Sequence, residues 1–472
     1  MTRVKCRDLA FVLSICGLFF GSAAYAETTY NKDIAPIMFR SCAACHHVGE
    51  VAPFPLLSYQ DTQKHAQQIV RVTQKHFMPP WKAEPNFGDF AGCRRLLDWQ
   101  VSLIKRWVDG GCAEGNVSDL PAPPKFSDGW QLGPPDLVVK MPAKYMVPAE
   151  GNDIYRCFVL PIDIPEDKFV TAVEYHPGNR SVVHHAILFL DHSGAARARD
   201  AKDGQPGYTS FAGPGFIPSG SLGGWAPGAF PKPLPSGVAI PLKKGNDLVI
   251  QTHFHPTGKA EEEQSSVALY FSKTPPKKIL AAPALWISQL DIPAGEKTYK
   301  VSDSFTLPVD FDLIGVTPHA HLLCKEIKAV ATLPGGATKP IIWIKDWDFD
   351  WQDQYQYTAP FRLPKGTKLS VDFTYDNSAE NIHNPSKPPK QVRLGEQTTD
   401  EMGILFLQGI VANEQEMVAL LEAQITKGMN SVKAAASSEI EGFRKRTEAN
   451  GGKMTADDKA KVDDFVKRFL DK

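Results

Sequence analysis

Residues 182–190 read VVHHAILFL, a short apolar run that holds two adjacent histidines near its start. A run of this length and composition is typical of a buried β-strand. Comparable runs, separated by turns rich in Gly, Pro and Asn, are Asp136–Met141, Asp247–Thr252, Val267–Phe271, Lys328–Leu333, Ile341–Ile344 and Leu369–Tyr375. We therefore expect antiparallel sheets over most of the chain.

The chain of 472 residues is too long for one hydrophobic core. Two prolines in Thr274–Lys277 mark the best break within the β region, which predicts two antiparallel β-sandwich domains over 136–275 and 276–412. Helix-forming residues return after them, with an apolar stripe of Met417, Leu420, Leu421 and Ile425. Residues 413–472 are therefore predicted to be a helical tail.

The N-terminus has the pattern of an export signal. Basic residues precede the apolar run Leu9–Phe20, and Ala24-Tyr25-Ala26 supplies the small residues of a cleavage site. We expect residues 1–26 to be removed and the protein to be periplasmic or secreted. No later stretch is long and apolar enough to predict a transmembrane segment. A net charge of -1 without a basic block argues against nucleic-acid binding.

The segment Cys42-Ala43-Ala44-Cys45-His46 has the spacing of covalent haem attachment. Two thiols add to the haem vinyl groups, and the following histidine ligates the iron. Apolar residues at helical spacing surround the motif, and Pro121 begins a proline-rich linker over 121–135. The sequence therefore predicts an N-terminal all-α cytochrome c domain over 27–120 with one haem c.

The sixth iron ligand is predicted to be Met78, which two prolines follow on an extended loop. His47, His65 and His76 are the alternatives. Among the other cysteines, Cys93 and Cys112 bracket one predicted helix and are candidates for a disulfide bond. Cys157 and Cys324 form a second possible pair or are two buried thiols.

Histidines cluster at three places in the β region: His184-His185, His253-Phe254-His255 and His319-Ala320-His321. Residues two apart on a strand project from the same face, so an HxH sequence can place two imidazoles on one ion. Adjacent histidines point to opposite faces of a regular strand. Joint ligation by His184 and His185 therefore requires a bulge or a strand end.

The chemistry of the ligands selects the metal. Imidazoles suit copper, zinc and iron, whereas a thioether added to two imidazoles favours Cu(I). The candidate thioether is Met402, at the start of a predicted strand.

In order along the chain, the histidine clusters, Trp225-Ala226-Pro227-Gly228 and Asp400-Glu401-Met402 resemble the copper type II, ascorbate-dependent monooxygenases. These are the peptidylglycine α-hydroxylating and dopamine β-hydroxylating enzymes. The resemblance covers about residues 135 to 412, and the haem segment resembles a bacterial branch fused to a cytochrome. It implies two jelly-roll-like sandwiches that face each other across a solvent cleft.

The same resemblance implies two copper sites. One copper is held by His184, His185 and His253 in the first sandwich. The other, catalytic, copper is held by His319, His321 and Met402 in the second. His255, His176, His192 and His383 match no family ligand and are expected at the surface or next to ligands.

Three positions depart from the peptide-amidating enzymes. Thr317 stands where those enzymes have a carboxylate-binding Arg, and Ile404 and Phe406 stand where they have Asn and Tyr. The site is therefore expected to prefer a less polar substrate than a peptide ending in glycine.

The function implied is a monooxygenase that uses dioxygen to hydroxylate a C–H bond of an unknown small organic or peptide-like substrate. Haem c would pass electrons from a periplasmic electron donor to copper. The alternatives are a non-catalytic electron-transfer or copper-handling protein, and peroxide reduction at the haem if Met78 does not ligate the iron.

Overall fold

The computed structural model describes residues 27–48, 52–126, 129–210, 213–226, 229–449 and 459. The predicted signal peptide, residues 1–26, lies outside the described residues, as does most of the tail beyond Ala449. Within the described part, strands account for 34% of the residues and helices for 19%. None of the helices in this part combines the length and hydrophobicity needed to cross a bilayer.

In the first half of the β region, the described residues form eleven strands and one helix. They are β1 (Leu137–Lys140), β2 (Tyr145–Val147), β3 (Ile154–Pro161), β4 (Lys168–His176), β5 (Val183–Asp191), α5 (Ala195–Asp203), β6 (Tyr208–Thr209), β7 (Gly220–Trp225), β8 (Val238–Leu242), β9 (Asp247–Phe254), β10 (Glu261–Glu263) and β11 (Ser266–Phe271). A five-stranded sheet in the order β6-β3-β9-β5-β7 packs against strands β1, β11, β4 and β8.

The second half contains another eleven strands. They are β12 (Lys278–Ala281), β13 (Ala284–Trp286), β14 (Asp291–Ile292), β15 (Tyr299–Thr306), β16 (Phe311–Ala320), β17 (Cys324–Thr332), β18 (Thr338–Ile344), β19 (Tyr355–Leu363), β20 (Lys368–Tyr375), β21 (Val392–Arg393) and β22 (Gly403–Val411). The four-stranded sheet β15-β20-β17-β18 packs against β22, β16 and β19 around a second core. Every strand predicted from an apolar run is confirmed.

The two halves share one sheet. Strand β12 begins just after Pro275 and Pro276, pairs in parallel with β8 of the first half and antiparallel with β22 of the second. The result is a nine-stranded sheet in the order β1-β11-β4-β8-β12-β22-β16-β19, with β13 also on β22. The sandwiches are therefore joined by backbone hydrogen bonds as well as by the chain connection.

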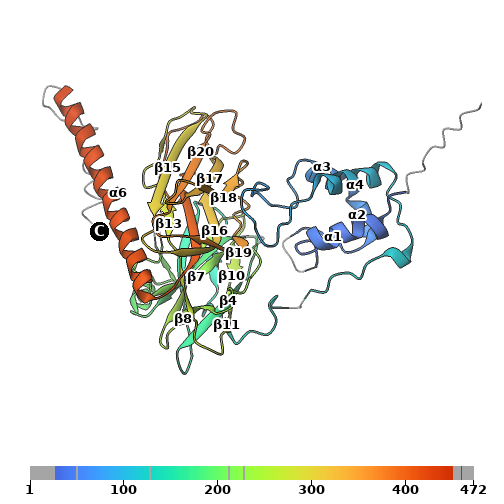
Figure 1. Cartoon of the computed structure of the whole chain (residues 1–472), viewed down its shortest axis with the longest axis horizontal. Helices are drawn as coiled ribbons and strands as arrows, with labels where there is room; N and C mark the ends of the chain where they lie inside the picture. Colours follow the sequence, from blue (N-terminus) through green and yellow to red (C-terminus); the bar gives the residue numbers. More distant parts are fainter. Residues whose placement is uncertain are drawn as a thin grey trace, which may run out of the picture.

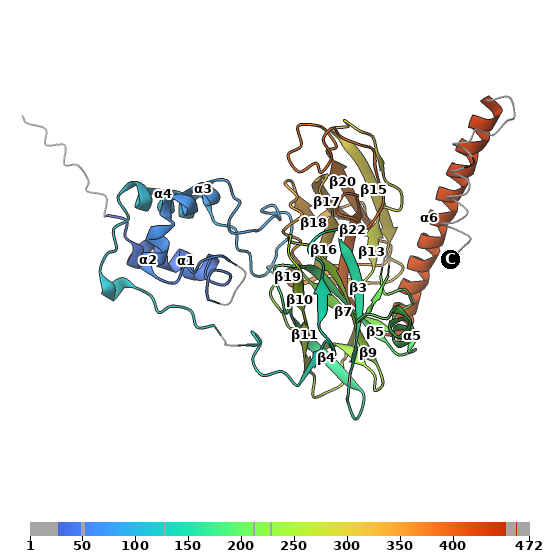
Figure 2. The same ribbon diagram turned by 180° about the vertical axis from the view of Figure 1, so that it is seen from behind.

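The N-terminal helices are short. They are the π-helix η1 (Tyr30–Ile34), α1 (Ala35–Ser41), α2 (Tyr59–Lys64), α3 (Ala66–Gln74), α4 (Asp98–Asp109) and the 3-10 helix η2 (Val117–Asp119). Ser58 caps α2, because its Oγ accepts a hydrogen bond from the Asp61 amide at 3.1 Å. These helices lie on one side of the sandwiches in both views (Figures 1 and 2).

The prediction of an all-α cytochrome c domain over 27–120 is wrong. Between α3 and α4 the chain leaves the helices, and Ala83 and Phe90 form β-bridges with Ile344 and Tyr357 of the second sandwich. Phe90 and Trp81 are buried in the core of that sandwich. The reason is tertiary: their aromatic partners come from β19, far along the sequence, and no local periodicity reports such a contact.

The C-terminal helix α6 (Glu414–Ala449) packs on the second sandwich at its start and then projects away from it (Figure 1). Leu420 is buried, and Met417 contacts the same core. Leu421 and Ile425 are 53% and 62% exposed, so only half of the predicted apolar stripe packs against the sandwich.

Candidate metal centre

A β-bulge brings the two adjacent histidines together. On β5 the pairing register shifts between Val183 and His185, and His185 then pairs with His253 on β9. His184 is the extra residue, and its ring turns to the same side as that of His185. The Nδ1 atoms of His184 and His185 lie 3.1 Å apart. The structural condition set by the sequence for joint ligation is therefore met.

Three ring nitrogens converge at this point. Nδ1 of His185 also lies 3.4 Å from Nδ1 of His253, and the ligand atoms of all three rings fall within 4.8 Å of one another. Imidazole nitrogens bound at about 2 Å to one tetrahedral ion lie roughly 3.3 Å apart. The two separations, from Nδ1 of His185 to Nδ1 of His184 and of His253, match this spacing.

Asp153 lies behind His253. Its Oδ2 is 3.3 Å from Nε2 of His253, and its Oδ1 accepts a hydrogen bond from Nδ1 of His255 at 2.8 Å. Thr398, from the second sandwich, donates its hydroxyl to the same carboxylate. Burial opposes ionisation, but the contacts with His253, Thr398 and His255 outweigh it and hold the pKa of Asp153 below its usual value. A carboxylate on Nε2 leaves Nδ1 of His253 as the ligand atom.

The second predicted set lies where β16 ends and β22 begins. Ala320 pairs with Gly403 and His319 with Ile404, which places His321 opposite Met402. The buried carboxylate of Glu401 accepts hydrogen bonds from the backbone amides of both His321 and Met402. This shared acceptor fixes the two chain segments against each other.

Hydrogen bonds also orient the rings of this set. Nδ1 of His319 donates to Oε1 of Gln352 at 2.6 Å, and Nδ1 of His321 faces the carbonyl oxygen of Asp400 at 3.2 Å. With both Nδ1 atoms engaged, Nε2 is the free ligand atom of each ring.

The two sets adjoin, which differs from the expected arrangement across a solvent cleft. The ring centroids of His185 and His319 are 5.9 Å apart. Phe349 stacks on His184 with centroids 4.4 Å apart and meets the ring of His321 edge to face at 5.8 Å. The structure therefore forms one centre of five imidazoles, with an aromatic side chain between parts of the two sets.

Burial keeps the imidazoles of His184, His185, His319 and His321 neutral. Loss of solvent and neighbouring rings lower the pKa of His184 to about 3, and burial lowers the pKa of His319 to about 4. The same causes lower the pKa of His321 to about 3 and that of His185 well below its ordinary value. Neutral imidazole is the form that ligates metals.

The predicted haem-attachment segment, Cys42–His46, lies at the end of α1. Nδ1 of His46 faces the carbonyl oxygen of Phe54 at 2.9 Å, which leaves Nε2 to face an iron. Burial lowers the pKa of His46, so its ring is neutral as a ligand must be. Cys42 lies at the end of α1, and burial raises the pKa of its thiol to about 12. The ring orientation of His46 is the feature of this segment that fits an iron ligand.

Met78 and its alternatives are distributed around this motif. Met78 is half-buried on the loop after α3, where its amide donates to the carbonyl oxygen of Val72 at 3.2 Å. The ring of His65 stacks on Phe54, which in turn contacts His46, so His65 lies near the motif. His47 stacks on Phe126, and His76 follows α3 with a left-handed φ of 51°.

The remaining cysteines and histidines have separate positions. Within the described residues, none of Cys93, Cys112, Cys157 and Cys324 is in a disulfide bond. Cys157 and Cys324 belong to different cores, which explains why they do not meet. Of the histidines without a family role, His176 contacts Glu174 at 2.8 Å, and His255 and His383 are exposed.

Sequence reasoning missed the residues that support the histidines: Asp153, Gln352, Phe349 and Glu401. The first three stand in no metal-binding motif, and Glu401 was read only as the neighbour of Met402. Their contribution depends on contacts between strands and loops that are distant in sequence.

No protein-family model and no curated protein matches the chain. Among solved structures it is similar to the major capsid protein P2 of bacteriophage PM2, with 9% identity, 58% of this chain and 96% of that chain covered, and a TM-score of 0.24. The PBCV-1 protein VP54 gives 8% identity, coverage of 57% and 94%, and a TM-score of 0.21. A putative secreted protein from Eubacterium rectale has 9% identity, with 55% of this chain and 70% of that chain covered, and a TM-score of 0.19. Scores at this level carry no argument about function.

Proposed function

We propose that the protein is a periplasmic, copper-dependent monooxygenase-like oxidoreductase that hydroxylates a C–H bond with dioxygen and receives electrons through haem c. The observation that carries the proposal is the convergence of ring nitrogens from His184, His185 and His253, all within 4.8 Å of one another, beside the oriented rings of His319 and His321. One ion would be held by the first three residues. The other would be held by His319, His321 and Met402.

Copper is the metal that best suits both sets. Three neutral imidazoles accept copper in either oxidation state, and a thioether beside two imidazoles favours Cu(I) over zinc. When bound, the two coppers would supply one-electron chemistry with dioxygen, and the haem would supply electrons to them.

The protein's own residues provide orientation and exclusion of water. Gln352 accepts a hydrogen bond from Nδ1 of His319, and the carboxylate of Asp153 lies 3.3 Å from Nε2 of His253. Both contacts engage the ring nitrogen that would not ligate. Phe349 covers His184 and contacts His321, and His253 and His321 are each only 2% exposed. These features would hold the ligands in place while the oxidation state changes.

The position of the N-terminal segment supports a role for the haem in the same reaction. Arg94, from the chain between α3 and α4, contacts Asp353 at 2.5 Å. Asp353 directly follows Gln352, the partner of His319. The segment that carries the haem motif is thus anchored one residue from a support of the proposed metal centre.

The test begins with metal and haem content of protein purified from the periplasm. We expect one haem and two coppers per chain, with loss of one copper in His184→Ala and in His319→Ala. The exposed His383→Ala variant serves as the control and should keep both. Rapid mixing of the reduced, copper-loaded protein with dioxygen should oxidise the ferrous haem faster than in copper-free protein. An identical haem signal with and without copper would contradict the proposal.

A non-catalytic electron-transfer or copper-handling protein is the second candidate. The observation that favours it is the contact between the two sets, because five adjoining imidazoles could store copper without binding a substrate. Incorporation of oxygen-18 from dioxygen into an organic product separates the two functions. Copper binding without such a product would favour the second.

A further inference from the structure

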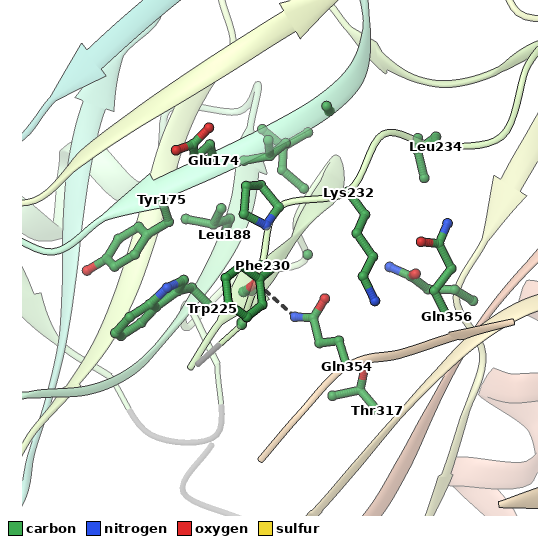
Figure 3. A pocket seen from close by; sticks show the side chains of 18 of the residues that line it. Glu174, Tyr175, Leu188, Trp225, Phe230, Lys232, Leu234, Thr317, Gln354 and Gln356 are labelled. Atoms are coloured by element: carbon green, nitrogen blue, oxygen red, sulfur yellow. Dashed lines mark hydrogen bonds between the residues drawn. The ribbon is translucent and has the colours of Figure 1, made fainter. Parts of the chain in front are cut away.

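A pocket of about 180 Å³ lies between the two sandwiches, next to the metal centre. Its walls come from β4, β5 and β7 of the first sandwich, the chain before β8, and β16, β19 and β22 of the second. Figure 3 shows its interior, with Trp225 and Phe230 toward one side and Lys232, Gln354 and Gln356 toward the other. The pocket therefore has an apolar part and a polar part.

The apolar part is built from aromatic and aliphatic side chains of the first sandwich. Trp225 and Tyr175 contact each other with ring centroids 5.3 Å apart, and Phe230 and Leu188 line the same wall. Large apolar side chains with a few polar groups are typical of small-molecule sites.

The polar part is a floor of amides on the shared sheet. Gly315 on β16 pairs with Gln356 on β19 and with Gln408 on β22, so both glutamines flank a residue that has no side chain. Gln354 is fixed beside them, because its Nε2 donates to the carbonyl oxygen of Gly224 at 2.8 Å. These amides can donate and accept hydrogen bonds.

Lys232 is one of four charged side chains that line the pocket, with Glu174, Arg180 and Asp353. The carboxylate of Glu174 is already engaged by His176 and by the backbone amides of Gln131 and Leu132.

The side chain of Lys232 extends into the pocket on the side of Gln354 and Gln356 (Figure 3). Within the described residues, its ammonium group has no ion pair or hydrogen bond. The nearby carboxylate of Asp353 is already engaged by Arg94 at 2.5 Å. Burial lowers the pKa of Lys232, and the nearby carboxylate of Asp353 offsets only part of this effect.

The pocket lies near the His319 set. Thr317 lines the pocket and precedes His319 by two residues on the same face of β16, a distance of about 7 Å along a strand. A molecule in the pocket would therefore lie beside the metal centre.

We propose that this pocket binds a small carboxylate with an apolar body, and that the Lys232 ammonium group pairs with the carboxylate. The apolar wall receives the body, and the glutamine floor offers hydrogen bonds to the carboxylate oxygens that Lys232 does not reach. The pocket is slightly larger than the ~150 Å³ cavity that admits benzene in an engineered protein. One ring with one carboxylate, as in benzoate, matches this volume. That such a carboxylate is the substrate rests on the proposed function.

The binding test uses benzoate and its neutral analogue benzamide on the copper-free mature chain, measured by isothermal titration calorimetry. We expect benzoate to bind at least about tenfold more tightly than benzamide, since a charge-assisted pair is lost in the amide. Lys232→Gln should remove this preference, and the exposed Lys243→Gln should keep it. Equal affinities for the two compounds in the wild-type chain, or an unchanged preference in Lys232→Gln, would overturn the proposal.

Two further measurements keep the outcome interpretable. If Lys232→Gln does not fold by circular dichroism, the comparison of benzoate with benzamide on the wild-type chain decides alone. Loading with Cu(II) should broaden the proton resonances of bound benzoate, because the pocket adjoins the histidines. Binding without broadening would reject benzoate as a substrate analogue and leave the metal centre untouched. Failure to bind copper would reject the proposed function and leave the pocket's preference for carboxylates standing.

Discussion

Oε1 of Gln352 lies 2.6 Å from Nδ1 of His319, and it is the hydrogen-bond partner that sets the direction of this ring. Gln352→Leu keeps a similar volume but removes the acceptor. We expect the affinity of the His319 set for copper to fall by about 10- to 100-fold, the usual effect of losing such a partner. The His184 set should be unchanged. A two-site copper titration measures both affinities.

The matched control for that variant is Gln68→Leu, which makes the same change at an exposed position on α3. Its two copper affinities should equal those of the wild-type chain. Copper affinities in Gln352→Leu that equal those of the wild-type chain would show that Gln352 does not orient a ligand.

Phe90 tests the contact between the N-terminal segment and the second sandwich. It is 8% exposed and packs against Trp81, Tyr355 and Tyr357. Phe90→Ala should lower the free energy of unfolding of this sandwich by about 3 kcal/mol, the cost of a large cavity. Phe77→Ala, at a side chain 47% exposed in the same segment, should cost less than about 1 kcal/mol. Urea unfolding compares the two; similar losses would contradict the burial of Phe90.

The metal-free protein should lose stability as the pH falls below about 6.5. The pKa is about 3 for His184 and about 4 for His319 in the folded chain, and both imidazoles take their ordinary value near 6.5 when unfolded. The unfolded state therefore binds protons at a higher pH than the folded state does. As a result, the free energy of unfolding falls as the pH is lowered from about 6.5 to about 4.

Thermal unfolding of metal-free protein between pH 7 and pH 5 checks this dependence. His184→Gln together with His319→Gln should make the decline shallower. His383→Gln, at an exposed position, should leave it unchanged. A melting temperature that does not change over this range would rule out the buried neutral imidazoles as its source.

The identity of the sixth iron ligand separates Met78 from His65. If Met78 ligates, the ferric protein should show the Met–iron charge-transfer band, and Met78→Ala should abolish it. His65→Ala should retain the band, as should Met146→Ala at an exposed methionine of the first sandwich. A wild-type spectrum without the band would instead support an open haem site and peroxide chemistry.

The strands were predictable because each is encoded locally. The run VVHHAILFL became β5, and the requirement for a bulge at its two histidines followed from the alternation of side chains along a strand. The order of the histidine clusters identified the ligand candidates for the same reason. Each cluster is a short motif whose geometry depends on its own strand.

Features that depend on pairing between distant segments were not predictable. The parallel pair of β8 with β12, which unites the sandwiches, joins two short strands with no distinctive sequence. His185 and His319 lie next to each other because this strand pair joins the two sandwiches. Lys232 and Gln352 are ordinary polar residues in the sequence, and only the packing of loops against the shared sheet gives them a site to act in.

The excursion of the chain between α3 and α4 makes the helices a closed loop attached to the sandwiches at two places, at Trp81–Phe90 and again where the linker enters β1. Bending of the chain at one attachment cannot move the N-terminal helices away from the sandwiches while the other attachment stays in place. Cutting the gene between the linker and β1 would not yield two independent proteins. The second sandwich would lose the side chains that pack on Tyr355 and Tyr357. The helical fragment would expose the apolar surfaces of Trp81 and Phe90 to solvent.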